Sequence, residues 1–145
     1  MFQRILLPTD GSELSARAVL AGVSFAKEVG AELVAMTALP DFKTFTANAD
    51  MIESTEDEYL SASEARAGGY LAVAADAARA AGVACATALV RSDEPHEAIL
   101  RTARERGCDL IIMASHGRRG LGGVLLGSET QKVLVHSAIP VLVYR

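Results

Sequence analysis

Residues 109–131, DLIIMASHGRRGLGGVLLGSETQ, decide the fold class, because an apolar run, a glycine-rich loop and a helix start follow one another directly. The run 110–114 predicts a buried strand. The loop after it contains Gly117, Gly120, Gly122, Gly123 and Gly127. A helix is predicted to begin at Ser128. Glycines let a backbone approach a ligand closely, and a helix N-terminus offers unpaired N–H groups, so the stretch predicts a phosphate-binding loop and a nucleotide as its first candidate ligand.

Two common phosphate-binding motifs are absent from the sequence. Residues 117–123 never reach the Gly-Lys-Ser/Thr ending of a P-loop. The first predicted strand leads into residues 8–12, Pro-Thr-Asp-Gly-Ser, and not into a GxGxxG turn. Phosphates would therefore bind without a Walker lysine. Arg118 and Arg119 offer positive charge, although paired arginines on a loop are usually only solvated.

Short apolar runs and helical patterns alternate along the rest of the chain. Strands are expected at 4–8, 32–38, 83–90, 109–114 and 140–144, and helices at 13–29, 53–81, 94–106 and 128–136. Strands that are apolar throughout, separated by helices, indicate a parallel sheet covered on both faces. We therefore expect one α/β domain over residues 1–145, a doubly wound five-stranded parallel sheet with helices on both faces and strand order 3-2-1-4-5.

The expected topology also predicts where a ligand would bind. In doubly wound sheets, ligands bind beyond the carboxyl ends of the strands, where the strand order reverses. Three segments follow strand ends and should meet there, namely 8–12, 38–41 and 114–128. The polar stretch 40–52 is either a ligand-covering loop or an ordinary connection.

Composition limits the classes of partner. The chain of 145 residues carries 18 acidic and 14 basic side chains, no Lys/Arg-rich block and no tryptophan, which argues against a nucleic-acid surface. No apolar stretch approaches the roughly 20 residues that span a bilayer, and no signal sequence is evident, so we expect a cytoplasmic protein without a membrane partner. An acidic protein can still bind ATP, because the local field of a loop matters more than total charge.

The sequence does not predict a catalytic centre. Cys85 and Cys108 belong to no CxxC pair and are expected to be buried, reduced thiols. The three histidines, His96, His116 and His136, lack metal-ligand spacing, and only His116 lies beside the glycine loop. We expect at most a slow ATP hydrolysis supported by Mg²⁺ and backbone donors, and whether the protein is an enzyme stays open.

Four stretches together indicate a family: ILLPTDGS at 5–12, SHGRRG at 115–120, LGS at 126–128 and SAIPVLV at 137–143. With them, the chain resembles the universal stress protein family, nucleotide-binding type, over its whole length. That family's ATP-binding signature is Gly, two residues, Gly, nine residues, Gly, then Ser or Thr. Gly117, Gly127 and Ser128 match it, whereas Ala114 replaces the first glycine. A methyl group there is a small change if φ is negative, and a serious one if φ is positive or the ligand touches Cα.

The resemblance implies that ATP or AMP, with Mg²⁺ as the nucleotide complex, binds these positions. The implied contacts are Pro8, Thr9, Asp10, Ala38, Met113, Gly117, Gly127, Ser128, Glu129 and Thr130. Asp10 would meet the ribose or adenine, and Ala38 would lie against the adenine. The two glycines and Ser128 would hold the phosphates through N–H groups and a hydroxyl. Glu129 and Thr130 would contact phosphate or its bound Mg²⁺.

Several of these residues also fit a purely structural role. Asp10 and Ser12 can cap the first helix, and Ser92 or Asp93 can cap the helix that begins near residue 94. Ser128 with the glutamine three residues later fits a Ser-x-x-Gln capping box, which would satisfy the helix end without a ligand.

Two functions compete. In the first, nucleotide occupancy orders the glycine loop and segment 40–52 and so signals stress to an unknown protein partner. In the second, the protein is a homodimeric stress-response adapter that binds no nucleotide, an alternative favoured by Ala38 and Ala114. A flavin or redox protein is less favoured, because no aromatic residue is a candidate for stacking on the flavin ring. The resemblance implies a homodimer formed through the strand at 140–144.

Overall fold

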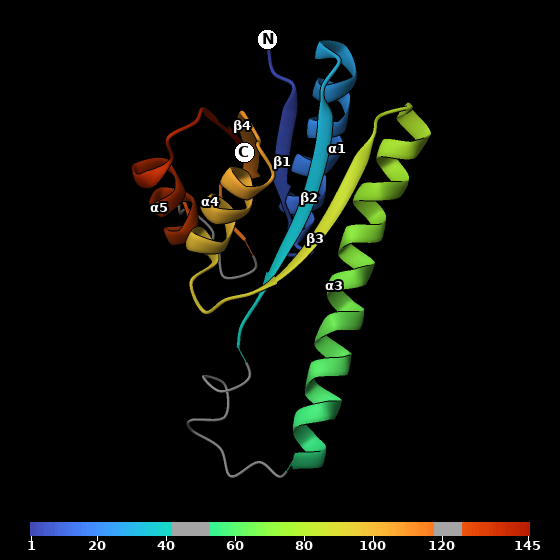
Figure 1. The fold of residues 1–145 in the computed structure, drawn as a ribbon, viewed down its shortest axis with the longest axis vertical. Helices are drawn as coiled ribbons and strands as arrows, with labels where there is room; N and C mark the ends of the chain where they lie inside the picture. The colour runs from blue at the N-terminus through green and yellow to red at the C-terminus, as the bar shows by residue number, and fades with distance from the viewer. Residues whose placement is uncertain (42–52, 118–125) are drawn as a thin grey trace.

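The computed structural model describes residues 1–41, 53–117 and 126–145 (Figure 1). A single five-stranded parallel sheet has the order β3-β2-β1-β4-β5. Its strands are β1 (Arg4–Pro8), β2 (Glu32–Leu39), β3 (Cys85–Arg91), β4 (Leu110–Ala114) and β5 (Val141–Tyr144). The helices are α1 (Glu13–Val29), α3 (Glu53–Ala81), α4 (Pro95–Glu105) and α5 (Ser128–His136). The predicted fold class and strand order are confirmed, while most of segment 40–52 and the middle of the glycine loop lie outside the described residues.

Helices cover both faces of the sheet, α1 and α3 on one side and α4 and α5 on the other (Figure 1). Because successive strand side chains point to opposite faces, β1 contributes Ile5 and Leu7 to the core under α1 and α3, and Leu6 to the core under α4 and α5. All three side chains are at most 1% exposed. Because β1 is buried on both faces, its central residues are all apolar and do not alternate with polar ones.

The strand order reverses beside β1. The chain builds outward from β1 to β2 and β3, then returns to the other side of β1 to add β4 and β5. Parallel register sets Leu6 opposite both Val34 of β2 and Ile111 of β4. The carboxyl ends of β1, β2 and β4 therefore lie at one edge of the sheet, which positions the loops that follow them.

Helix α3 packs a narrow stripe of mostly small residues on the sheet. Ala67, Leu71, Ala74 and Ala78 are each at most 8% exposed, at the spacing expected for one helix face. The helix ends at Gly82, whose φ of +75° is the left-handed conformation that favours glycine. Among the helices of the described parts of the chain, none combines the length and apolarity needed to cross a membrane.

The cysteine prediction holds for one residue and only partly for the other. Cys108 is buried, and burial is the main reason that the pKa of its thiol rises to about 11. Cys85 begins β3 at the edge of the sheet and is only half-buried, although burial still raises the pKa of its thiol. Neither thiol forms a disulfide.

Candidate functional site

The turn after β1 is held by hydrogen bonds around Thr9. Its side chain is buried, and its hydroxyl oxygen accepts from the Ser15 hydroxyl at 2.8 Å and the Gly11 N–H at 3.3 Å. The Thr9 N–H donates to the Met36 carbonyl at 2.8 Å, and the Thr9 carbonyl accepts from the Thr37 hydroxyl at 2.9 Å. The turn is therefore fixed to β2 and α1 without any ligand.

Asp10 and Ser12 both take part in the start of α1, as the structural interpretation predicted. The Ser12 hydroxyl caps the helix by accepting the Ser15 N–H at 3.2 Å. An Asp10 carboxylate oxygen accepts the Ser12 N–H at 2.9 Å. The Asp10 carboxylate is therefore part of the turn. Asp10 is only partly buried, so it also remains accessible at the carboxyl edge of the sheet.

Gly11 is required at this turn for two reasons. Its φ is +77°, and a Cβ atom there would run into the ring of Tyr70 from α3. Sequence reasoning did not anticipate the Tyr70 contact. No local pattern could have revealed it, because Tyr70 comes from a helix that the fold, and not the sequence spacing, brings to the turn.

The β1 turn and the start of the glycine loop lie against each other. A Cβ atom added at Gly117 would collide with Oδ2 of Asp10. Among the described glycines, positive φ occurs at four positions and Gly117 is not one of them, so a side chain at Gly117 would displace the Asp10 carboxylate but would not strain the backbone. The structure thus brings together two residues that the sequence assigned to one site, Asp10 and Gly117.

Gly127 is similarly enclosed. Its N–H donates to the Ser115 carbonyl at 2.7 Å, and an added Cβ would lie 3.1 Å from Cα of His116. Gly127 is also the N-cap of α5, with extended backbone (φ −68°, ψ 157°). The predicted Ser128 capping box is therefore wrong: Ser128 is the first helical residue, and the Gln131 side chain donates to the Leu126 carbonyl at 3.0 Å.

The first turn of α5 supplies the donors that a phosphate would use. The first intrahelical bond runs from the Gln131 N–H to the Gly127 carbonyl at 3.0 Å. The N–H groups of Ser128, Glu129 and Thr130 precede it and have no acceptor within the helix. Because the Gly127 N–H is occupied by Ser115, these three groups, and not that of Gly127, are the backbone donors that this helix end could offer to an anion.

Ala114, the departure from the family signature, fits its strand. No described residue other than glycine has positive φ, and Ala114 is paired in β4 opposite Tyr144. It is 8% exposed, and its carbonyl accepts the buried Thr130 hydroxyl at 3.0 Å. The backbone at this position therefore accommodates a methyl group, and the Thr130 side chain serves to attach α5 to β4.

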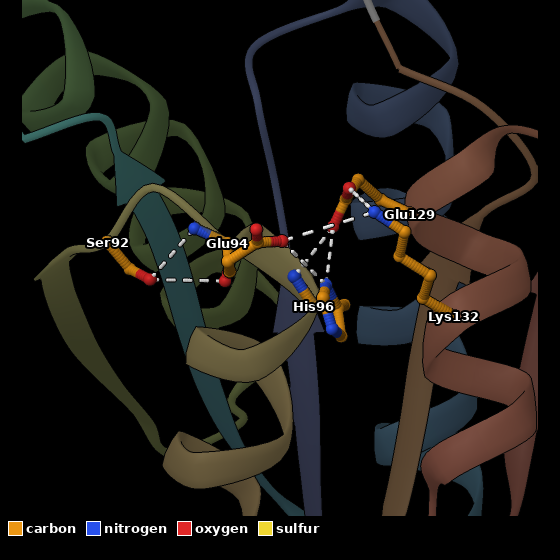
Figure 2. Close-up of polar contacts among 5 residues, drawn as sticks. All are labelled: Ser92, Glu94, His96, Glu129 and Lys132. Carbon is orange, nitrogen blue, oxygen red and sulfur yellow. Dashed lines mark hydrogen bonds and ion pairs between the residues drawn. The ribbon is translucent and has the colours of Figure 1, made fainter. Parts of the chain in front are cut away.

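The N-terminus of α4 lies against the first turn of α5 and is capped from it. Its N-cap is Glu94, so the prediction of Ser92 or Asp93 at the cap is wrong; the Ser92 hydroxyl instead accepts the Glu94 N–H at 3.2 Å. Glu94 makes no side-chain capping bond. The acceptor comes from α5, where Oε2 of Glu129 accepts the His96 N–H at 2.8 Å (Figure 2).

Glu129 has partners at both oxygens. Oε2 lies 3.2 Å from Nδ1 of His96, and Oε1 lies 3.3 Å from Nζ of Lys132 (Figure 2). Partial burial alone would raise the pKa of Glu129, but the hydrogen bonds from the His96 N–H, Lys132 and the His96 ring outweigh it and lower the pKa. Sequence reasoning gave no role to His96, because its lack of metal-ligand spacing carried no signal for a contact between helices.

The remaining predicted site residues occupy neighbouring strand ends. Pro8 ends β1 opposite Met36, and Ala38 lies near the end of β2. Met113 is buried near the end of β4, and both it and Ala38 belong to the core on the α4 side of the sheet. The site thus combines a rigid turn, two space-limited glycines and a helix N-terminus at one edge, an arrangement able to hold a phosphate-bearing ligand.

Comparison with known proteins places this arrangement in a family. The profile of the universal stress protein family matches residues 1–145. Universal stress protein YxiE of Bacillus subtilis is 35% identical over an alignment that covers all of both chains. A universal stress protein of Thermus aquaticus is 32% identical, again over the full length of both chains.

Solved structures of other proteins share this fold, and one of them was determined with a bound ligand. The structure of MJ0577, a universal stress protein of Methanocaldococcus jannaschii, has a TM-score of 0.84 and 29% identity, and the match covers 99% of this chain and 96% of that one. A universal stress protein solved in complex with cAMP has a TM-score of 0.72 and 28% identity, with 99% of this chain and 97% of that one covered.

Proposed function

The chain belongs to the universal stress protein family, and from that premise we propose that it binds an adenine nucleotide, ATP or AMP, at the carboxyl edge of β1, β2 and β4. Asp10 and the neighbouring turn would receive the nucleoside, and the first turn of α5 would receive the phosphates. Occupancy would then alter the surface shown to a protein partner and so signal stress.

One observation carries the proposal: Gly117 lies so close to the Asp10 carboxylate that a Cβ atom added to it would clash with Oδ2 of Asp10. The turn after β1 and the start of the glycine loop, which the expected topology and the resemblance assign to one site, therefore lie against each other beside the reversal of the strand order. Gly127 is crowded by Ser115 and His116, and it is the N-cap of α5, whose first N–H groups are the donors proposed for phosphate. The cAMP complex of a 28% identical family member supports an adenine nucleotide as the ligand class.

Phosphate binding would rest on backbone donors. The N–H groups of Ser128, Glu129 and Thr130 lie ahead of the first intrahelical bond, and the helix dipole adds partial positive charge there. A phosphate-bound Mg²⁺ would enter with the nucleotide. The Ser128 hydroxyl, on an exposed first helical residue, is the side-chain group best placed to join these donors.

The competing function is a homodimeric adapter that binds no nucleotide. Two residues of the sequence favour it, Ala38 and Ala114, and at Ala114 a methyl group replaces the signature glycine. The strand conformation of Ala114 weakens that support, since the methyl group requires no unusual backbone. Ala38 still offers a smaller surface to an adenine ring than a larger apolar residue would.

Calorimetric titration of nucleotide-stripped protein with Mg-ATP and with AMP tests the proposal. We expect micromolar binding that is lost in Gly127→Val, because the added Cβ would lie only 3.1 Å from Cα of His116 and would crowd the start of α5. Gly68→Val is the matched control: that glycine lies on α3 with open space around it, so binding should persist. If the unmodified protein gives no heat of binding with either nucleotide, the proposal is overturned in favour of the homodimeric adapter.

A further inference from the structure

Glu129 poses an electrostatic problem for phosphate binding. It is the second residue of α5, directly after Ser128, and its lowered pKa keeps it ionised at neutral pH. A carboxylate in the first turn of a helix is attracted to the same N–H groups that bind an anion. A freely rotating Glu129 would therefore compete with a phosphate for its donors and repel it.

The structure turns this carboxylate toward α4. Oε2 accepts the His96 N–H at 2.8 Å and lies 3.2 Å from the His96 ring, while Oε1 lies 3.3 Å from the Lys132 ammonium (Figure 2). The side chain of His96 is 13% exposed, so it is held in place, whereas that of Lys132 is 46% exposed. A partly buried imidazole and a backbone donor thus fix one oxygen, and the more exposed Lys132 ammonium pairs with the other.

The charges around His96 come from three directions. Glu94 precedes α4, and its Oε2 lies 3.6 Å from Nδ1 of His96 and 4.0 Å from Nζ of Lys132. On α5, besides Glu129 and Lys132, the ring of His136 lies 6.2 Å from the His96 ring. The possible metal-coordinating atoms of Glu94, His96 and Glu129 lie within 4.8 Å of one another, which is close enough to hold a metal ion. Lys132 already pairs with both carboxylates, so the cluster contains its own cation. We therefore interpret the cluster as one that positions the Glu129 carboxylate.

We propose that His96 is a positioning residue that keeps the Glu129 carboxylate turned away from the phosphate-binding end of α5. This inference rests on the proposed nucleotide site and deepens it, because it assigns to α4 a part in recognising the phosphate charge. When His96 is lost, Glu129 keeps its backbone bond but loses the ring beside Oε2, and its charge can move toward the phosphates. The cost should grow with the negative charge of the ligand.

The test compares three ligands that share adenine and ribose but differ in phosphate charge: Mg-free ATP, AMP and adenosine. His96→Ala should weaken ATP about fivefold and AMP less, and it should change adenosine by less than about twofold. His136→Ala is the matched control, since it removes a neighbouring imidazole, 6.2 Å from the His96 ring, that is not among the partners of the Glu129 carboxylate in the described part of the chain. Its affinities should stay at those of the unmodified protein.

A second variant separates positioning from structure. Glu129→Gln removes the charge, so ATP binding should tighten slightly, and His96→Ala in that background should have no further effect. Equal weakening of ATP and adenosine by His96→Ala, or no rescue by Glu129→Gln, would overturn the inference. Weaker ATP binding by Glu129→Gln alone would also overturn it and restore Glu129 as a phosphate-side ligand. Failure of the unmodified protein to bind any of the three would instead overturn the proposed function beneath it.

Discussion

Single residues decide how the site can bind, and Ala114 is the most informative of them. The residue that breaks the family signature lies in a regular strand, bonded through its carbonyl to Thr130 and paired opposite Tyr144. The glycines that do match the signature lie in crowded positions, next to Asp10 and His116, and do not have left-handed backbone. The departure at Ala114 therefore places no demand on the backbone, whereas a side chain at either matching glycine would meet its neighbours.

Ala114→Gly should change ATP affinity by less than about threefold, because the native backbone needs no glycine conformation there. Parallel titration of the variant and the unmodified protein checks this. A much tighter complex in the variant would show that the methyl group itself touches the ligand. The free energy of unfolding of the Ala114→Gly protein should fall by about 0.5–1 kcal/mol, because glycine has more conformational freedom than alanine in the unfolded chain.

Glu129 should contribute to acid sensitivity. Its pKa is lowered in the folded protein, so the stability it provides is complete above the ordinary value of 4.5 and is lost as pH falls through the lowered folded pKa. Urea unfolding at pH 6 and at pH 3 should show a smaller loss for Glu129→Gln than for the unmodified protein. An identical loss in both proteins would contradict a lowered pKa at this residue.

Helices and strands follow the local pattern closely, while contacts between them do not. The predicted bounds of α1, α3 and α5 agree with the structure, because apolar spacing and the glycines after the first two helices act locally. By contrast, β3 begins two residues later than predicted, at Cys85. The contacts of Tyr70 with Gly11 and of His96 with Glu129 could not be predicted, since each joins elements brought together only by the fold.

The same contrast explains which caps were predicted correctly. Ser12 caps α1 with a side chain three residues from its donor, which is a local pattern. The start of α4 uses Glu129 from another helix, and the start of α5 uses the extended backbone of Gly127. Sequence spacing therefore identified the capping residue only where the cap is local.

Helix α3 allows a direct test of glycine conformation. Gly69 lies in the helix interior with open space around it, so Gly69→Ala should stabilise the protein by about 0.5–1 kcal/mol. Gly82, with φ +75° at the end of the same helix, is the matched control, and Gly82→Ala should destabilise by about 1–2 kcal/mol. Thermal or urea unfolding measures both; the same sign for the two variants would contradict this account of α3.

At the scale of the whole molecule, the sheet is protected by helices on both faces but has edges at β3 and β5. The carbonyls of Pro140 and Tyr144 accept bonds from β4. Since neighbouring residues in a strand point their backbone groups to opposite sides, those of Val141 and Val143 face the outer edge. Leu142 on β5 is 39% exposed, so this edge strand also leaves apolar side-chain surface uncovered.

We propose that a second copy of the chain pairs with this edge to form a homodimer. Val143→Pro removes an outward N–H without breaking the β4 ladder, so it should convert the dimer to monomer while the fold is retained. Light scattering coupled to size exclusion measures the mass. A dimeric mass that persists in the variant would contradict pairing through β5.

The central claim is that an adenine nucleotide binds at the carboxyl edge of β1, β2 and β4. Amide signals of the isotope-labelled protein, followed by NMR during titration with Mg-ATP, test it most directly. The account predicts the largest shifts at Asp10, Gly117 and Ser128, and unchanged signals at Arg4 and Arg106 on the opposite edge. Saturable shifts confined to the opposite edge, or none at millimolar nucleotide, would contradict it.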